Sequence, residues 1–104
     1  MNEKDFDSQI RDMVKLYRWD FAYHTWNAKH SAQGFPDWVL VRDRRIVALE
    51  LKGTTGKLTD DQVICLEMLR LSGKVEVYAL WPEDSDLAVE ILKGENNVKT
   101  VKPL

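Results

Sequence analysis

Gly34-Phe35-Pro36-Asp37-Trp38-Val39-Leu40-Val41, followed by Arg42-Asp43-Arg44-Arg45 and then by Ile46-Val47-Ala48-Leu49-Glu50-Leu51-Lys52-Gly53, is the stretch that decides the fold. Residues 38–41 and 46–52 are apolar runs with strand character, and the short polar segment between them predicts a tight hairpin. Pro36-Asp37 and Glu50-Leu51-Lys52 each lie at one end of a predicted strand.

The second strand combines apolar and charged positions on one face. Side chains two residues apart on a strand point the same way, roughly 7 Å from one another, so Glu50 and Lys52 share a face. Ile46 and Ala48 belong to the same face, and the other face carries Val47, Leu49 and Leu51. We therefore expect the strand to be buried at its start and to carry a carboxylate and an amine out of the core at its end.

This trio of charged residues suits metal-assisted chemistry. Two carboxylates, Asp37 and Glu50, can hold a hard cation such as Mg²⁺, which acidifies water and polarises a phosphoryl oxygen. A neighbouring Lys52 can orient the attacking water or neutralise charge on the phosphate. The alternative is a simple Glu50–Lys52 ion pair at a strand end, since a Glu-x-Lys tripeptide is common by chance. The preceding Pro36-Asp37 reduces the weight of that alternative.

These motifs resemble the VRR-NUC nucleases, which belong to the PD-(D/E)xK superfamily of restriction enzymes and archaeal Holliday-junction resolvases. The resemblance rests on Gly34 to Asp37, on Glu50-Leu51-Lys52 and on Gln62 in Leu58-Thr59-Asp60-Asp61-Gln62. It extends to the opening Glu3-Lys4-Asp5-Phe6, to Tyr23-His24-Thr25, to Ser31-Ala32-Gln33-Gly34 and to the closing Gly73-Lys74-Val75-Glu76-Val77-Tyr78. It spans residues 3–93, and small stand-alone members of this size are typical of phages and prophages.

The resemblance implies a restriction-endonuclease-like α/β core of order α-β-β-β-α-β, with a mixed sheet flanked by helices and a short C-terminal helix. It also implies an Mg²⁺- or Mn²⁺-dependent DNA endonuclease in which Asp37, Glu50 and the backbone carbonyl of Leu51 hold the metal. Glu3 is a further candidate ligand, Lys52 and Gln62 join the carboxylates as catalytic residues, and cleavage leaves 5′-phosphate and 3′-hydroxyl ends.

The expected substrate is branched DNA such as a Holliday junction. Symmetric cleavage of a junction would suit a homodimer with a two-fold axis, because the dimer supplies two active sites. Two alternatives remain: another nuclease of the superfamily with a different substrate, and a non-catalytic DNA-binding or interaction module on the same fold. The complete set of Asp37, Glu50 and Lys52 argues against the second alternative.

Gln62 and Glu3 each have a structural explanation besides the catalytic one. Thr59 and Gln62 form a capping-box pattern, in which the glutamine side chain reaches back to the N–H of the cap. We expect that one side chain cannot serve both as this cap and as an active-site group. A glutamate near a helix start is favoured by the helix dipole, and Asp7 lies one turn further along as a competing candidate.

Positive charge for DNA binding is scattered. The loop residues Lys29, His30 and Ser31, together with Lys57, are the candidates for contact with DNA. The run from Arg42 to Arg45 is either part of a basic patch or a solvated hairpin turn. A net charge of −2 disfavours strong nonspecific binding, although a local patch and a metal can supply the attraction. His24, alone in a strand, is expected to pack or to form hydrogen bonds.

The remaining expectations concern organisation. The 104 residues predict one domain, with a core over 3–93 and a tail at 95–104 in which Val98 and Val101 are candidates for an edge strand. Helices are predicted over 5–18, from Thr59 to Ser72-Gly73, and over 86–93, with further strands at 19–26 and 75–81. The single Cys65 excludes an internal disulfide and is expected to be buried and inert. The chain lacks an apolar stretch of about 20 residues, so we expect no membrane partner and a cytoplasmic location in a bacterium or a phage-infected cell.

Overall fold

The structure is a computed structural model that describes residues 1–25 and 32–94. The helices are α1 (Glu3–Leu16), α2 (Asp60–Leu71) and α3 (Ser85–Lys93), and a short 3₁₀ turn, Pro82–Asp84, precedes the last of them. The strands are β1 (Phe21–His24), β2 (Trp38–Arg42), β3 (Arg45–Leu51) and β4 (Glu76–Leu80). The predicted order α-β-β-β-α-β with a short closing helix is confirmed. The predicted edge strand in the tail lies outside the described residues.

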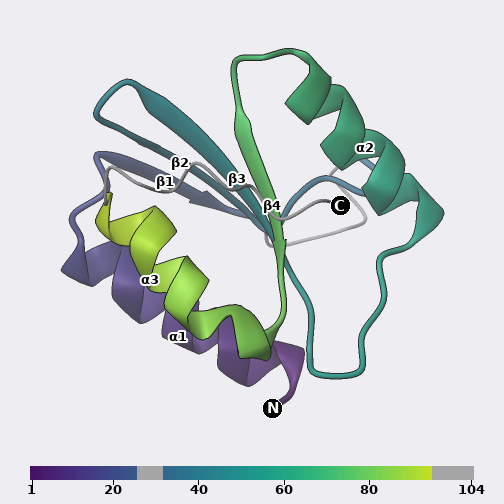
Figure 1. Ribbon diagram of the computed structural model, residues 1–104, viewed down its shortest axis with the longest axis horizontal. Coiled ribbons are helices and arrows are strands. Elements are labelled where there is room, and N and C mark those ends of the chain that lie inside the picture. The colour runs from purple at the N-terminus through teal and green to yellow at the C-terminus, as the bar shows by residue number, and fades with distance from the viewer. Residues whose placement is uncertain (26–31, 95–104) are drawn as a thin grey trace.

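The strands form one mixed sheet in the order β1-β2-β3-β4. β1 and β3 are both antiparallel to β2, whereas β4 is parallel to β3. A parallel pair needs a crossover connection, and α2 supplies it. As a result α2 covers one face of the sheet, while α1 and α3 lie together on the other (Figure 1).

Two apolar clusters follow from the alternation of side chains along β3. Val47, Leu49 and Leu51 face α1 and α3, where the larger cluster includes Phe6 and Ile10. On the opposite face Ala48 packs with residues of α2 and β4 in a smaller cluster. The predicted division of β3 into these two faces is confirmed, and Glu50 belongs to the face of α2 by the same alternation.

The expected direction of burial along β3 is wrong. Ile46, near the start of the strand, is 38% exposed, whereas Glu50, near its end, is 1% exposed. The start follows the hairpin turn, whereas near the end of the strand Glu50 lines one cavity together with residues from the starts of α1 and α2 and from the loop before β2. The carboxylate is thus inside the protein, and this burial determines its chemistry.

Several element boundaries differ from the predictions. α1 begins at Glu3 rather than at residue 5, because Asn2 caps it through a 2.8 Å hydrogen bond from the N–H of Asp5 to its side chain. The strand expected over 19–26 is shorter, because Trp19 turns into the core and donates from its indole to the carbonyl of Leu92 at 3.1 Å. Within the described residues, no helix is long and apolar enough to cross a membrane.

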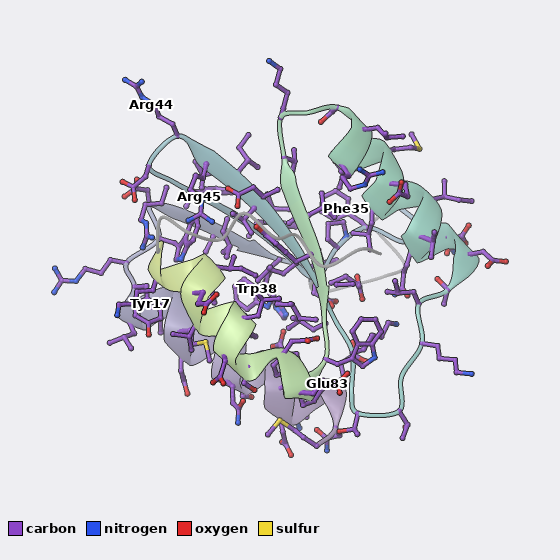
Figure 2. All side chains as sticks on the ribbon, in the orientation of Figure 1. Tyr17, Phe35, Trp38, Arg44, Arg45 and Glu83 are labelled. Carbon is purple, nitrogen blue, oxygen red and sulfur yellow. The ribbon has the colours of Figure 1, made fainter. Side chains whose placement is uncertain are left out.

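The Arg42–Arg45 segment is a two-residue hairpin turn. Asp43 and Arg44 adopt positive φ angles of 52° and 64°, as in the hairpin turns whose twist matches that of paired strands. Arg42 and Arg45 donate to carbonyls of Leu92 and Ile91 at the end of α3. Arg44 points away from the molecule, whereas Arg45 lies against it (Figure 2). Of the basic residues in this turn, Arg44 is the exposed one.

Candidate active site

Three carboxylates from separate elements meet at one end of the sheet. The register pairs Trp38 with Leu49, and continuing it by one residue would place Asp37 opposite Glu50. Glu3, in the first turn of α1, completes the group. One carboxylate oxygen from each of Glu3, Asp37 and Glu50 can be chosen so that all three lie within 4.8 Å of one another. The hairpin and the helix start thus bring together residues far apart in the sequence.

Asp37 is fixed by backbone contacts on both sides. Its Oδ2 accepts a 2.8 Å hydrogen bond from the N–H of Leu51, and its carbonyl accepts one of 2.9 Å from the N–H of Thr25. The hydroxyl of Thr25 also donates to the carbonyl of Pro36 at 2.8 Å. Burial raises the pKa of Asp37, and the Leu51 N–H offsets part of that rise. The side chain is therefore held at the end of β3.

Glu50 is the buried carboxylate of the group. Its Oε2 accepts a 3.2 Å hydrogen bond from Gln62 and lies 4.0 Å from the Lys52 ammonium. Among the described residues its other oxygen, Oε1, is buried without a hydrogen-bond partner. Burial, and then the charge of Asp37, raise the pKa of Glu50 from 4.5 to about 9. A buried acid with an unpaired oxygen is costly, so this position calls for a positive partner.

The donor set fits a hard divalent cation. Carboxylate oxygens are the ligands that Mg²⁺ and Mn²⁺ prefer, and Glu50 Oε1 accepts no hydrogen bond among the described residues. A hydrogen bond between the carboxyl groups of Glu50 and Asp37 requires a proton on one of them, and a cation would replace that proton. A cation there would favour the charged forms of Glu3, Asp37 and Glu50, which the protein environment alone disfavours. The fit rests on the protein's own groups.

Glu3 and Asp7 occupy different environments. Asp7 Oδ1 accepts hydrogen bonds from the indole of Trp38 at 2.9 Å and lies 3.0 Å from His24 Nε2. Glu3 is an exposed residue, and partial burial of its carboxyl group, followed by the charge of Asp37, raises its pKa. Asp7 therefore has a structural role in tying α1 to β1 and β2, and Glu3 is the one that lies in the carboxylate group. His24 also packs on the Trp38 ring, with centroids 4.4 Å apart, as expected of a packing residue.

Lys52 follows β3 directly and is largely enclosed. Its side chain is 12% exposed, and its ammonium lies 4.0 Å from Glu50 Oε2. The expected proximity of the two charges is confirmed, but the lysine does not project into solvent as a strand-end side chain would. The lysine thus brings a positive charge next to the carboxylate group.

Gln62 serves in two places at once, contrary to the expectation from the sequence. Its Oε1 accepts a 2.9 Å hydrogen bond from the N–H of Thr59, and the Thr59 hydroxyl accepts one from the N–H of Gln62 at 3.2 Å. Its Nε2 donates to Glu50. A carboxamide has an acceptor at one end and a donor at the other, so the helix cap and the active-site contact use different atoms.

The segment before Asp37 rests on the first turn of α2. Gly34 has φ of +78°, and a Cβ there would be 2.2 Å from the carbonyl oxygen of Asp61. Together with Phe35 and Thr25 this segment lines a cavity of about 360 Å³ into which Asp37, Glu50 and Gln62 also open. Figure 2 places Phe35 on the side of α2. The roles of Thr25 and Gly34 were not predicted from the sequence, although the Gly-x-Pro-Asp spacing marked the segment.

The candidates for DNA contact are only partly within the described residues. Lys29, His30 and Ser31 lie outside them. Lys57 is exposed in the loop between β3 and α2.

Cys65, expected to be buried, is half-buried, and burial followed by the charge of Glu50 raises the pKa of its thiol.

The class of protein is that of the nucleases with a restriction-endonuclease-like fold. Its features in this chain are the β2–β3 hairpin, the crossover helix α2 and the group of carboxylates and lysine at the strand ends. The chain belongs to the VRR-NUC domain family, whose sequence model matches residues 2–95. A solved structure called a VRR_NUC domain protein superposes with a TM-score of 0.68 at 18% identity, covering 89% of this chain and 86% of that one.

A second solved structure is Hjc of Archaeoglobus fulgidus, a Holliday junction resolvase from an archaeal hyperthermophile. It superposes with a TM-score of 0.55 at 20% identity, covering 75% of this chain and 67% of that one. At such identities the two likenesses concern the fold. The comparison with curated proteins gave no match.

Proposed function

We propose that this protein is a metal-dependent DNA endonuclease that hydrolyses phosphodiester bonds in branched DNA. The observation that carries the proposal is the environment of Glu50: a carboxylate 1% exposed, with an unpaired oxygen, beside a second carboxylate and an enclosed lysine. Stability alone does not favour such a group, because an acid whose pKa is raised by burial lowers the free energy of unfolding at neutral pH. Strongly raised pKa values of this kind are typical of functional sites.

Each residue has a role that follows from its position. Glu3, Asp37 and Glu50 would hold Mg²⁺ or Mn²⁺, with the Leu51 carbonyl as a further donor, and the cation when bound would activate water and polarise the phosphate. Lys52 would orient the nucleophile and stabilise negative charge developing on the phosphate. Gln62 fixes the Glu50 side chain by its hydrogen bond. In-line attack on phosphorus would leave a 5′-phosphate and a 3′-hydroxyl.

Branched DNA is proposed as the substrate because the fold is shared with a Holliday junction resolvase and because the family resemblance points the same way. The carboxylate group itself recognises phosphate and metal rather than DNA structure. Selectivity would therefore come from surfaces outside the site, including exposed Lys57 and the loop residues Lys29, His30 and Ser31.

The test is a cleavage assay on four-way junction, flap and linear duplex DNA of equal length. We expect cleavage of branched substrates with Mg²⁺ or Mn²⁺, its loss with EDTA, and DNA binding with little cleavage in Ca²⁺, which orders water loosely. Asp37→Asn purified in parallel controls for contaminating nucleases. Equal cleavage, or equal metal affinity, of the wild type and Asp37→Asn would refute the assignment.

Lys52→Ala separates catalysis from binding. Loss of one group that stabilises the transition state typically lowers a rate on the order of 10²–10³-fold, while affinity for the junction in Ca²⁺ should change little. Single-turnover cleavage within about threefold of wild type would remove Lys52 from the proposed mechanism.

We further propose that the protein acts as a homodimer, because two symmetric incisions need two active sites. Exposed apolar side chains available for association include Ile64, Met68 and Leu71 of α2 and Phe21 and Tyr23 of the edge strand β1. Sedimentation at micromolar concentration is the direct test. A strict monomer that cleaves both strands of a junction in one binding event would contradict the proposal.

A further inference from the structure

The Lys52 ammonium is placed by packing more than by polar contacts. Its side chain is 12% exposed, yet in residues 1–25 and 32–94 its shortest ion-pair distance is 4.0 Å, to Glu50 Oε2. At that separation the Glu50 carboxylate does not form a hydrogen bond that would fix the ammonium in one orientation. The long aliphatic stem of a lysine can be held by its neighbours, so the neighbours of the stem decide where the charge points.

The turn that follows Lys52 packs directly on this stem. The N–H of Gly56 donates to the carbonyl of Gly53 at 2.9 Å, which closes the turn. A Cβ on Gly56 would lie 3.3 Å from both Cβ and Cδ of Lys52, closer than ordinary van der Waals contact. The turn therefore lies close to the lysine stem and leaves little room for a side chain at Gly56.

The end of β4 holds both the lysine and the turn. The carbonyl of Leu80 accepts a 3.0 Å hydrogen bond from the N–H of Lys52. The next residue, Trp81, donates from its indole N–H to the carbonyl of Gly56 at 2.8 Å. Trp81 is itself fixed, because its N–H donates to the Asp84 side chain at 2.8 Å. Leu80, the last residue of β4, thus binds the backbone of Lys52, and the next residue, Trp81, binds the turn that lies over the lysine side chain.

We propose that Trp81 is a positioning residue for Lys52, acting through the turn formed by residues 53–56. The proposal rests on the proposed nuclease function and adds a residue outside the Glu-x-Lys motif to it. The indole holds Gly56 against the lysine stem, and the stem in turn aims the ammonium at the carboxylate group. The N–H and the hydroxyl of Thr54 hold the start of the turn on the carbonyl of Met1, each at 3.0 Å. Without the indole hydrogen bond the Gly56 end of the turn loses its contact with the end of β4, and the ammonium loses its fixed direction. Small displacements of a catalytic group can be costly, about 10²-fold in rate for 1 Å.

The experiment compares Trp81→Phe with the matched control Trp19→Phe. Both changes remove an indole N–H that donates to a backbone carbonyl, at 2.8 Å for Trp81 and 3.1 Å for Trp19. Trp19 packs instead beside Arg42 and α3, on the hairpin side of the sheet. Each change is made in the wild type and in Lys52→Ala. Single-turnover cleavage, junction affinity in Ca²⁺, and acylation of Lys52 in metal-free protein by mass spectrometry are measured.

We expect Trp81→Phe to lower the cleavage rate about tenfold or more with junction affinity within about twofold of wild type. Acylation of Lys52 should become faster by about threefold or more, because the stem is less enclosed. Trp19→Phe should change neither the cleavage rate nor the rate of Lys52 acylation. In the Lys52→Ala background Trp81→Phe should have no further effect on the rate, because two residues acting through one group are non-additive.

An undiminished rate in Trp81→Phe, or an equal loss in the Lys52→Ala background, would overturn the proposal. If Trp81→Phe does not fold, Gly56→Ala replaces it, since its Cβ would press on the Lys52 stem; unchanged rate and acylation in that variant would be equally decisive. Failure of the wild type to cleave any DNA would instead refute the proposed function. The acylation measurement needs no activity, and it would still decide whether Trp81 places Lys52.

Discussion

Gln62 donates from Nε2 to Glu50 Oε2 over 3.2 Å while its Oε1 accepts from the N–H of Thr59 over 2.9 Å. One amide thus joins the buried carboxylate of β3 to the N-terminus of α2. The cap fixes the glutamine, and the glutamine orients the glutamate. The start of the crossover helix is therefore part of the site, although capping alone would explain the residue.

The two contacts of Gln62 can be separated by substitution. In Gln62→Glu the carboxylate still reaches back to the cap, but the donor to Glu50 is lost and a negative charge is added beside it. We expect single-turnover cleavage to fall on the order of 10²-fold with the urea midpoint near wild type. Thr59→Ala should show the reverse, a loss of about 1 kcal/mol in stability with cleavage largely kept. Wild-type cleavage by Gln62→Glu would leave Gln62 as a cap alone.

Strand alternation and cap chemistry are local properties, which is why the sequence predicted the two faces of β3 and the Thr59 cap of α2 correctly. The burial of Glu50 is not local, because it depends on α2 and the segment at Gly34 closing over the end of the strand. A hydrophobic pattern cannot report that closure. The same reason hid the double use of Gln62, whose second partner is 12 residues away in the sequence.

Tertiary contacts likewise decided between Glu3 and Asp7, which share one helix face in the sequence. The Asp7 carboxylate contacts the side chains of Trp38 and His24. These contacts exist only because α1 packs against β1 and β2. The indole of Trp81 is a comparable case, since its partner Gly56 is 25 residues away and has no side chain to suggest a contact.

The raised pKa of Glu50 makes the metal-free protein less stable as the pH rises. Between about pH 4.5, its usual value, and about 9, the folded protein keeps a proton that the unfolded chain releases. The contribution of Glu50 to the free energy of unfolding therefore falls through this window and is highest below it. Glu50→Gln removes the difference, so with EDTA at about pH 8 it should be more stable than wild type and flatter in its pH dependence. Urea unfolding followed by tryptophan fluorescence measures both.

Glu76→Gln is the matched control, because its pH dependence should have the opposite sign. Burial alone would raise the pKa of Glu76, but hydrogen bonds from Arg45 at 2.7 and 2.9 Å and from Tyr78 at 2.9 Å hold it below the usual value. Its contribution is present above the unfolded pKa and is lost as the pH falls through the folded one. Parallel pH profiles for the two variants would contradict the assignment of both shifts.

Glu3 should contribute to cation binding from outside the hairpin. Its raised pKa and its place within the carboxylate group predict that Glu3→Gln weakens Mn²⁺ binding about tenfold or more. Asp5→Asn is the control, since Asp5 is exposed in the same helix turn and lies outside the group. Calorimetric titration of both variants in the absence of DNA is the measurement. If Glu3→Gln and Asp5→Asn bind Mn²⁺ with equal affinity, Glu3 is not a ligand, and Asp37 and Glu50 are the carboxylate ligands.

Gly34 and Gly73 offer a test of how the segment before Asp37 is held. Both have positive φ, +78° and +72°, but a Cβ on Gly34 would be 2.2 Å from the carbonyl oxygen of Asp61, whereas one on Gly73 would meet nothing within 4 Å. Gly73→Ala should therefore cost only the backbone strain, about 1–2 kcal/mol. Gly34→Ala adds a backbone clash that forces the segment off the first turn of α2.

We expect Gly34→Ala to be the more destabilising of the two and to lower cleavage in the molecules that remain folded. The displaced segment leads directly into Pro36, whose carbonyl Thr25 holds, and into Asp37, whose Oδ2 meets the Leu51 N–H. Asp37 should then lose its fixed place beside Glu50, and Mn²⁺ affinity should fall with the cleavage rate. Urea unfolding, Mn²⁺ titration and single-turnover cleavage on both variants decide the matter. Equal destabilisation by the two substitutions, with Mn²⁺ affinity unchanged in Gly34→Ala, would mean that the contact with α2 does not position Asp37.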